Sequence, residues 1–275
     1  MTQTTQIPAP APPLPGRFLT FDPETYRADA LELEALLEDR AATRSQRFRC
    51  GTALFRDDLP RSGQLNALRV DAGVPPLDPG ALMQFVGELQ DGLPQRSIRV
   101  VEDERAHQLR PALAAAGWVV GRLTLMAPRR RPTPAVDVAS VREIDVAALK
   151  GARSGTLRRE HRDLDSADQL LVAGSMPIEG TDLRAFAATV SGEVAAYAIA
   201  RVAGRVAKLT EMDALVRSQG QGLGRAVIWG AVTALRQEGV RLVVVEAADE
   251  GWAKWIFVRL GFDDIGHTHR FVRPW

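Results

Sequence analysis

Three glycines at alternate positions mark the segment with the clearest chemistry, Val216-Arg-Ser-Gln-Gly-Gln-Gly-Leu-Gly-Arg-Ala226. It follows a strand-like stretch, and apolar residues at 223, 227, 228, 231, 232 and 235 then have helical spacing. Glycines at a helix N-terminus let backbone N–H groups approach an anion closely, and the helix dipole favours negative charge there. The segment therefore predicts an anion site built from the main chain, with the Arg225 cation beside it.

Two common phosphate-binding motifs do not fit this loop. A Walker A loop needs a lysine after its last glycine, but Arg225 follows Gly224. The dinucleotide fingerprint needs a third small residue at 225 or 227, where arginine and valine stand. The loop therefore belongs to another kind of phosphate site, or it is only a tight connection between a strand and a helix.

The elements around the loop predict alternating strands and helices. In the second half we expect a strand at 138–144, a helix-prone stretch at 146–171, a meander at 183–190, 193–202 and 205–215, a helix at 222–238, a buried strand at 241–246, a helix at 250–260 and a last strand at 262–272. In the first half, Asp22 and Pro23 have the residue types of an N-cap and a first helical position.

The two halves of the sequence repeat each other. Residues 98–102 (IRVVE) align with 242–246 (LVVVE), a shift of 144 positions, and the same shift places Gly117-Trp118 on Gly261-Phe262. It also aligns residues 50–55 with 194–199 and residues 64–68 with 208–212. Several blocks that agree on one shift indicate a duplicated unit.

Proline-rich stretches divide the chain. Residues 1–16 are uncharged and rich in proline, which predicts a disordered tail, and residues 128–136 are expected to be a linker. Residues 17–127 would then form an N-terminal domain and residues 137–275 a C-terminal domain.

Over about residues 138–275 the sequence resembles the GNAT N-acetyltransferase superfamily. The family motif, Gln/Arg-x-x-Gly-x-Gly/Ala, corresponds to Gln219-Gly-Gln-Gly222-Leu-Gly224, and the strand ending at Glu246 and the Leu260-Gly261-Phe262 turn also match. The resemblance implies an α/β (α+β) fold of two tandem GNAT-like domains, each a mixed, mostly antiparallel sheet flanked by helices.

The resemblance also implies acetyl-CoA as the co-substrate, lying between two splayed strands, and no metal. The pantetheine arm would pair with the main chain near Leu215 and Val216. The pyrophosphate would lie on the N–H groups of Gln219, Gly220, Gln221, Gly222, Leu223, Gly224 and Arg225.

The first copy is expected to be degenerate. The same shift replaces the glycine motif with Pro75-Pro-Leu-Asp-Pro-Gly80, in which three prolines remove N–H donors and Asp78 places a negative charge where a pyrophosphate would lie. We therefore expect one acetyl-CoA site per chain, in the C-terminal half.

For catalysis, the resemblance points to Glu211, at the position where many such enzymes place a base or a water-positioning carboxylate. Asp213, two residues on, faces the same side of the strand and is the second candidate. A solvated strand carboxylate is the alternative for Glu211. The family's usual tyrosine acid is replaced by Phe257, which has no proton to give.

Other chemically versatile side chains are assigned structural roles. His267 and His269 share a strand face and are alternative acids, although a surface or packing role is favoured. Trp252 and Trp255 are expected to fill core rather than line an acyl pocket, and Cys50 is expected to be a small core residue.

Composition limits the partners. Lys+Arg is 35 against Asp+Glu 34, so no strong charge attracts nucleic acid or a membrane surface. No apolar run is long enough to span a bilayer, and a single cysteine suits a reducing compartment, so a cytoplasmic monomer or homodimer is expected.

The sequence thus predicts an acetyl-CoA-dependent N-acyltransferase. It would transfer an acetyl group to the amine of a small-molecule acceptor, with its active site in the C-terminal domain. The alternative is a non-catalytic acyl-CoA-binding or regulatory tandem GNAT protein.

Overall fold

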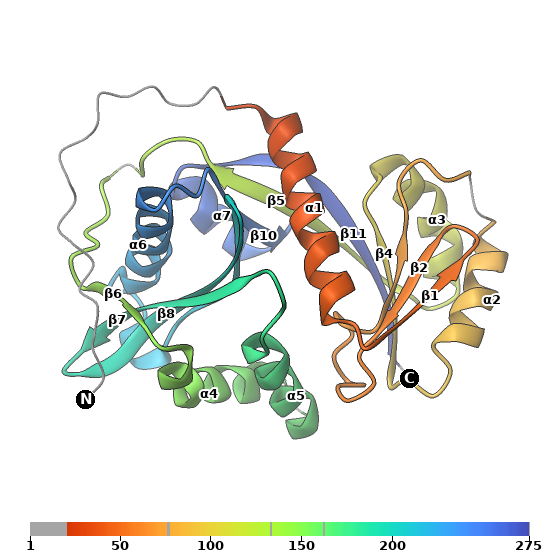
Figure 1. Cartoon of the computed structure of the whole chain (residues 1–275), viewed down its shortest axis with the longest axis horizontal. Coiled ribbons are helices and arrows are strands. Elements are labelled where there is room, and N and C mark those ends of the chain that lie inside the picture. The colour runs from red at the N-terminus through yellow and green to blue at the C-terminus, as the bar shows by residue number, and fades with distance from the viewer. Residues whose placement is uncertain (1–20, 76–77, 133, 162, 275) are drawn as a thin grey trace.

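The computed structural model describes residues 21–274 except 76–77, 133 and 162 (Figure 1). The tail predicted over residues 1–16 falls outside the described residues.

The described strands join into a single sheet. They are β1 (Arg44–Phe48), β2 (Gly51–Phe55), β3 (Ala67–Val70), β4 (Gln95–Val100), β5 (Val119–Pro128), β6 (Val141–Ile144), β7 (Asp182–Val190), β8 (Glu193–Ala203), β9 (Val206–Ala214), β10 (Leu242–Ala248) and β11 (Phe262–Pro274). Their order across the sheet is β1-β2-β3-β4-β11-β5-β10-β9-β8-β7-β6. The β3–β4 and β9–β10 pairs are parallel and the other pairs antiparallel, so the predicted mixed, mostly antiparallel architecture is confirmed.

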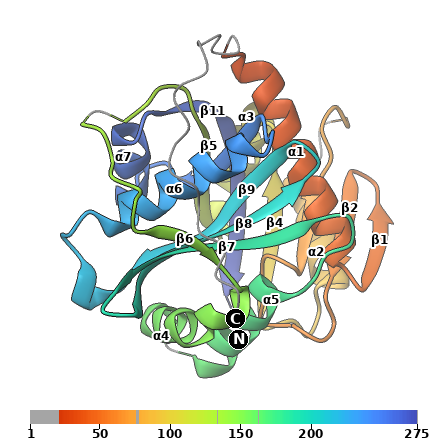
Figure 2. The same ribbon diagram turned by 60° about the vertical axis from the view of Figure 1, so that its left-hand side comes forward.

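Helices cover both faces of this sheet. They are α1 (Pro23–Ala41), α2 (Pro79–Leu89), α3 (Asp103–Ala115), α4 (Lys150–Glu160), α5 (Leu164–Ser175), α6 (Leu223–Gln237) and α7 (Trp252–Arg259), with short 3-10 turns η1 (Val146–Leu149) and η2 (Val216–Ser218). In Figure 2, α6 and α7 lie on one side of β7, β8 and β9, and α4 and α5 lie on the other. The buried residues of β8 alternate accordingly, with Ala198 facing the α6 core and Tyr197 facing the η1 and α4 side.

The sequence patterns explain where the helices begin. Asp22 caps α1, because its carboxylate accepts hydrogen bonds from the backbone N–H groups of Glu24 (3.1 Å) and Thr25 (3.2 Å), and Pro23 follows it. The helix-prone stretch 146–171 divides into η1, α4 and α5. In the two copies, α2 begins at Pro79 and α6 at Leu223, which is the shift found in the sequence.

The last strand of each copy pairs with a strand of the other copy. Strand β5, which ends the first copy, pairs with β10 of the second copy, and β11, which ends the second copy, pairs with β4 of the first. The two exchanged strands also pair with each other, from Phe262–Pro128 to Val272–Val119. Because β5 includes Pro128, regular structure extends one residue into the proposed linker.

The exchange predicts that the C-terminal half does not fold alone. A chain of residues 137–275 would lack β4 and β5, so β10 would lose one strand neighbour and β11 would lose both. The buried positions 125–127 would also be missing from the core. We expect this fragment to aggregate or to melt without cooperativity in a thermal scan monitored by circular dichroism. Co-expression with residues 17–136 should restore a cooperative melt. A monomeric, cooperatively melting fragment would contradict the prediction.

Candidate functional site

The glycine loop has an open backbone surface at the N-terminus of α6. Gly220 and Gly222 have positive φ angles of 80° and 78°, and Gly222 is the residue that precedes the helix. A Cβ atom added at either position would meet nothing within 4 Å, so the space above both residues is open. Gly224 has another role, because its Cβ would contact that of Ala214 at 3.4 Å and its small size lets the helix approach β9.

The N–H groups of this loop lack protein acceptors. Helix α6 has no side-chain cap, and within the described part of the chain the N–H groups from Gly220 to Arg225 have no hydrogen-bond partner. That of Gln219 is different, because it donates to the carbonyl oxygen of Val216 at 3.3 Å. Most of the predicted anion cradle is therefore available.

The equivalent helix of the first copy is capped by its own chain. At the start of α2 the carboxylate of Asp78 accepts a hydrogen bond from the N–H of Ala81 at 2.9 Å. An anionic side chain already occupies the position that would attract an anionic ligand there. The expectation that only the second copy binds acetyl-CoA agrees with this contrast.

Two parallel strands diverge beside the loop. Strands β9 and β10 pair only from Val206–Leu242 to Lys208–Val244. Beyond this point β9 continues along β8, and β10 pairs with β5. Leu215, expected near the pantetheine arm, donates its N–H to the carbonyl oxygen of Ala195 at 2.9 Å, while the side chain of Val216 is exposed.

Glu211 lies directly after a β-bulge. Ile199 of β8 faces Glu211 while Ala200 faces Leu209, so Thr210 is the extra residue on β9. Bulges redirect side chains and are frequent beside active sites. Here the bulge directs the Glu211 carboxylate toward α4.

Glu211 forms a two-point ion pair with Arg153 of α4. Its Oε1 lies 2.6 Å from Nη2 of Arg153 and its Oε2 lies 2.7 Å from Nε, and the Arg153 side chain is only 1% exposed. Arg153 also donates to the Ser175 hydroxyl. The pair rests against α5, because a Cβ added at Gly174 would lie 1.9 Å from Oε1 of Glu211. Sequence reasoning missed Arg153 and Gly174, since neither stands in a motif.

Asp213 is held by the same helix. Its Oδ2 accepts hydrogen bonds from the Thr156 hydroxyl at 2.5 Å and from Arg159 at 2.9 Å. Both predicted carboxylates therefore contact α4 on one side of β9. Nearby, burial raises the pKa of Tyr197 to about 12, so its phenol stays protonated at neutral pH.

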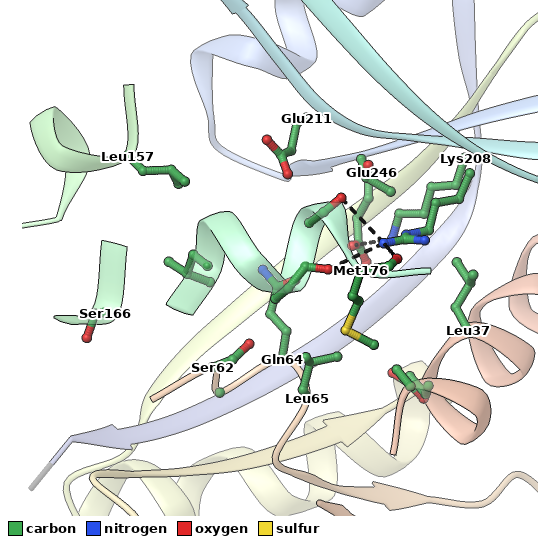
Figure 3. A pocket seen from close by; sticks show the side chains of 18 of the residues that line it. Leu37, Ser62, Gln64, Leu65, Leu157, Ser166, Met176, Lys208, Glu211 and Glu246 are labelled. Atoms are coloured by element: carbon green, nitrogen blue, oxygen red, sulfur yellow. Dashed lines mark hydrogen bonds and ion pairs between the residues drawn. The ribbon is translucent and has the colours of Figure 1, made fainter. Parts of the chain in front are cut away.

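A cavity of about 710 Å³ opens between the two copies of the fold (Figure 3). Its walls come from α4, α5 and β9 of the second copy and from α1 and residues 61–65 of the first. Figure 3 shows Leu37, Gln64 and Leu65 of the first copy across the cavity from Leu157 and Glu211. The first copy therefore contributes directly to the candidate acceptor site.

Buried charges form one wall of this cavity. Lys208 of β9 pairs with Glu34 of α1 and, at 3.1 Å, with Glu246 of β10, while Arg99 of β4 pairs with Glu34 and Glu38. Burial would raise the pKa of Glu246, but Lys208, Arg270 and Arg99 lower it to about 2. These ion pairs connect α1 to both copies.

The residue at the position of the family's usual tyrosine acid belongs to the hydrophobic core. Phe257 is buried and packs against Phe262, with ring centroids 5.5 Å apart. His269 is fully buried with its Nε2 2.5 Å from Oδ1 of Asp103, and His267 lies 3.8 Å from the same carboxylate. Burial and the nearby Arg122 lower the pKa of His267. Both histidines thus share one face, as predicted.

The prediction for the tryptophans was wrong. Trp252 and Trp255 are 76% and 70% exposed, because α7 turns Ala253, Ile256 and Phe257 toward the core instead. Cys50 is buried, as expected. Among the described residues, no group of three or more His, Cys, Asp or Glu side chains could hold a metal ion, and no helix is long and apolar enough to cross a membrane.

Known structures share this architecture. The chain is similar to a functionally unknown conserved protein from Staphylococcus epidermidis (14% identity, 86% of this chain and 95% of that one, TM-score 0.64). It is also similar to a GCN5-related N-acetyltransferase from Kribbella flavida (18%, 91% and 95%, 0.57) and to a tandem GNAT protein from the clavulanic acid biosynthesis pathway (16%, 91% and 95%, 0.54). The chain has a tandem GNAT fold. No family model and no curated protein sequence matches it.

The Arg153–Glu211 pair predicts that substitutions of these two residues have non-additive effects on the free energy of unfolding. Replacing Arg153 by methionine leaves the Glu211 charge without its partner, and we expect the free energy of unfolding to fall by about 3 kcal/mol. The double variant R153M/E211M removes both charges and should recover at least about 1 kcal/mol of that loss in urea titrations. Additive losses from R153M, E211M and the double variant would contradict a coupled pair.

Proposed function

We propose that this protein is an acetyl-CoA-dependent N-acyltransferase that acetylates the amine of a small molecule in the C-terminal half of the chain. One observation carries the proposal: an uncapped helix N-terminus, beside two diverging strands, adjoins β9, whose Glu211 carboxylate lines a cavity of about 710 Å³. That volume is in the range of small-molecule sites. Two structurally similar proteins are a GCN5-related N-acetyltransferase and a tandem GNAT protein, which agrees with this function.

The residues of the loop fit the phosphates of acetyl-CoA. The N–H groups of residues 220–225 would hold the pyrophosphate, and the helix dipole of α6 would favour its charge. Arg225 adds a cation there, and its buried Nε has no hydrogen-bond partner in the described residues. When bound, acetyl-CoA supplies the activated acetyl group as a thioester.

Glu211 would take up the proton of the acceptor amine, directly or through a water. The Arg153 guanidinium uses one direction on each carboxylate oxygen, which leaves further lone pairs for a proton or a water. Asp213 is the second candidate, although Thr156 and Arg159 already bind its Oδ2.

In this proposal no side chain replaces the family's usual tyrosine acid, at whose position Phe257 stands. A thiol has a pKa of about 8.5, so release of a free thiolate at neutral pH costs only about 2 kcal/mol. Chemistry without a dedicated acid is slower but feasible.

The first copy would bind no acetyl-CoA and would contribute to the site only as part of the cavity wall. It supplies α1 and residues 61–65 to the cavity, while Asp78 caps its own α2. We further propose that the protein acts in the cytoplasm as a monomer or homodimer, without nucleic acid, membrane or metal as a partner.

The loop predicts how acetyl-CoA affects thermal stability. For the wild-type protein, acetyl-CoA at 100 times its Kd should add about 2.7 kcal/mol to the free energy of unfolding and raise Tm. Replacing Gly222 by valine introduces a side chain where φ is 78° and the cradle is open, so this rise should disappear. Gly73→Val is the matched control, since Gly73 also has a positive φ (69°) and open space but lies in the first copy. Loss of the rise in the control as well would contradict the assignment.

The proposed reaction is tested by thiol release from acetyl-CoA with a panel of small amines. We expect turnover by the wild-type protein and a fall in kcat of about 100-fold in E211Q, with the acetyl-CoA-induced rise in Tm unchanged. E179Q is the control, because the Glu179 side chain is 92% exposed. Normal turnover by E211Q would mean that Glu211 only anchors Arg153. Acetyl-CoA binding without any thiol release would support the non-catalytic alternative.

A further inference from the structure

The cavity wall contains a buried guanidinium that pairs with no carboxylate of the described residues. Arg201 of β8 is 5% exposed and lines the cavity beside Lys208, its cross-strand neighbour on β9. Its Nη2 donates to the backbone carbonyl oxygens of Ala173 (3.3 Å), Gly174 (3.4 Å) and Met176 (2.9 Å). Its Nη1 is buried and has no partner among the described residues.

The neighbouring charges do not compensate Arg201. Arg153 and Arg201 both lie next to Gly174, and Glu211 is the adjacent carboxylate. Arg153 already binds both oxygens of Glu211. The other charges of this wall balance separately. Three cations act there on three carboxylates: Lys208, Arg99 and Arg270 on Glu34, Glu38 and Glu246. Two guanidiniums and one carboxylate leave the cluster with one positive charge in excess.

An unpaired buried charge is costly, and proteins rarely retain one without a role. Burial lowers the pKa of Arg201 to about 10; Glu211 opposes this effect and Arg153 adds to it. The carbonyl oxygens at the C-terminal end of α5 stabilise the charge in part. They leave Nη1 without a hydrogen-bond partner among the described residues.

We propose that the acceptor is an amino acid: its carboxylate binds Arg201 in the cavity while its amine faces Glu211. This inference rests on the proposed acetyltransferase function. A carboxylate matches the single excess charge, whereas a phosphate, with close to two negative charges at neutral pH, would exceed it. The planar guanidinium also suits a carboxylate.

The strand geometry allows one small molecule to reach both groups. Arg201 faces Lys208 across the β8–β9 pair, and Glu211 lies three residues further along β9 with the Thr210 bulge between them. Three residues of a bulged strand span less than about 10 Å, and neighbouring strands lie about 4.8 Å apart. Both side chains line the same cavity.

The test measures thiol release from acetyl-CoA with matched acceptors, namely a panel of α-amino acids, each compared with its own primary amide. The acid has a charged carboxylate where the amide has a neutral group. The amine of the amide is the less basic of the two amines, so a lower rate with the amide is not explained by protonation of its amine. For the wild-type protein we expect KM to be at least tenfold lower for the acid.

Variants of Arg201 test whether this side chain causes the lower KM for the acid. In R201M, KM for the acids should rise by about 10- to 100-fold, the usual effect of losing a hydrogen bond to a charged group, while the amides change by less than about threefold. R201K keeps a cation and should keep a preference for the acid, so it carries the test if R201M does not fold. R47M is the control, since Arg47 is an exposed arginine on β1 at the far edge of the sheet.

The outcomes separate this inference from the function on which it rests. Equal KM values for acids and amides in the wild-type protein, or an equal loss for both in R201M, overturn the amino-acid assignment and leave the acetyltransferase standing. Absence of thiol release with every amine overturns both. An acid preference that disappears in R201M and persists in R47M supports the inference.

Discussion

The pairing of β5 with β11 is the constraint on which the rest of the structure depends. Each strand ends one copy of the duplicated unit, and each lies beside the penultimate strand of the other copy. The two copies therefore share one sheet instead of meeting through a surface of side chains. A shared sheet determines the relative position of the copies through backbone hydrogen bonds, which leave little freedom for the cavity between them.

Helix α1 uses this arrangement to join the copies by charge. It lies against β5, β9 and β11, and its Glu34 pairs with Lys208 of the second copy and Arg99 of the first. Buried ion pairs of this kind contribute little net stability, but breaking one is expensive. Their effect is to specify one register of α1 over the sheet, and α1 in turn forms part of the cavity wall.

The two helices that follow equivalent strands show how a duplicated unit diverges. In α6 the N–H groups of residues 220–225 have no partner in the part of the chain that the structure describes, and Gly220 and Gly222 have left-handed backbone angles. In α2 a carboxylate from Asp78 satisfies the helix terminus. The same scaffold thus has a helix N-terminus without a side-chain cap in one copy and a self-capped helix in the other. The difference lies in the few residues before each helix, so it could be predicted from the sequence.

The order of the elements and the glycine loop could be predicted from the sequence, because both depend on short-range patterns: periodicity, capping residues and glycine spacing. The duplication followed from several blocks that agree on one shift, and the GNAT-like architecture from a resemblance to a known family. The sequence also identified Glu211 as a candidate. It did not determine the exposure of Trp252 and Trp255, since six of the eight residues of α7 are apolar and their spacing does not define which side is buried.

Which copy each last strand joins, and therefore which residues share the cavity, depends on long-range packing. Arg153, Arg201 and residues 61–65 stand in no motif, and they meet Glu211 or its cavity only because distant segments pack together. Strand exchange leaves the local pattern of every strand unchanged, since a strand is buried by whichever neighbour pairs with it. The partner is chosen by the global energy of the sheet, which no local stretch of sequence reports.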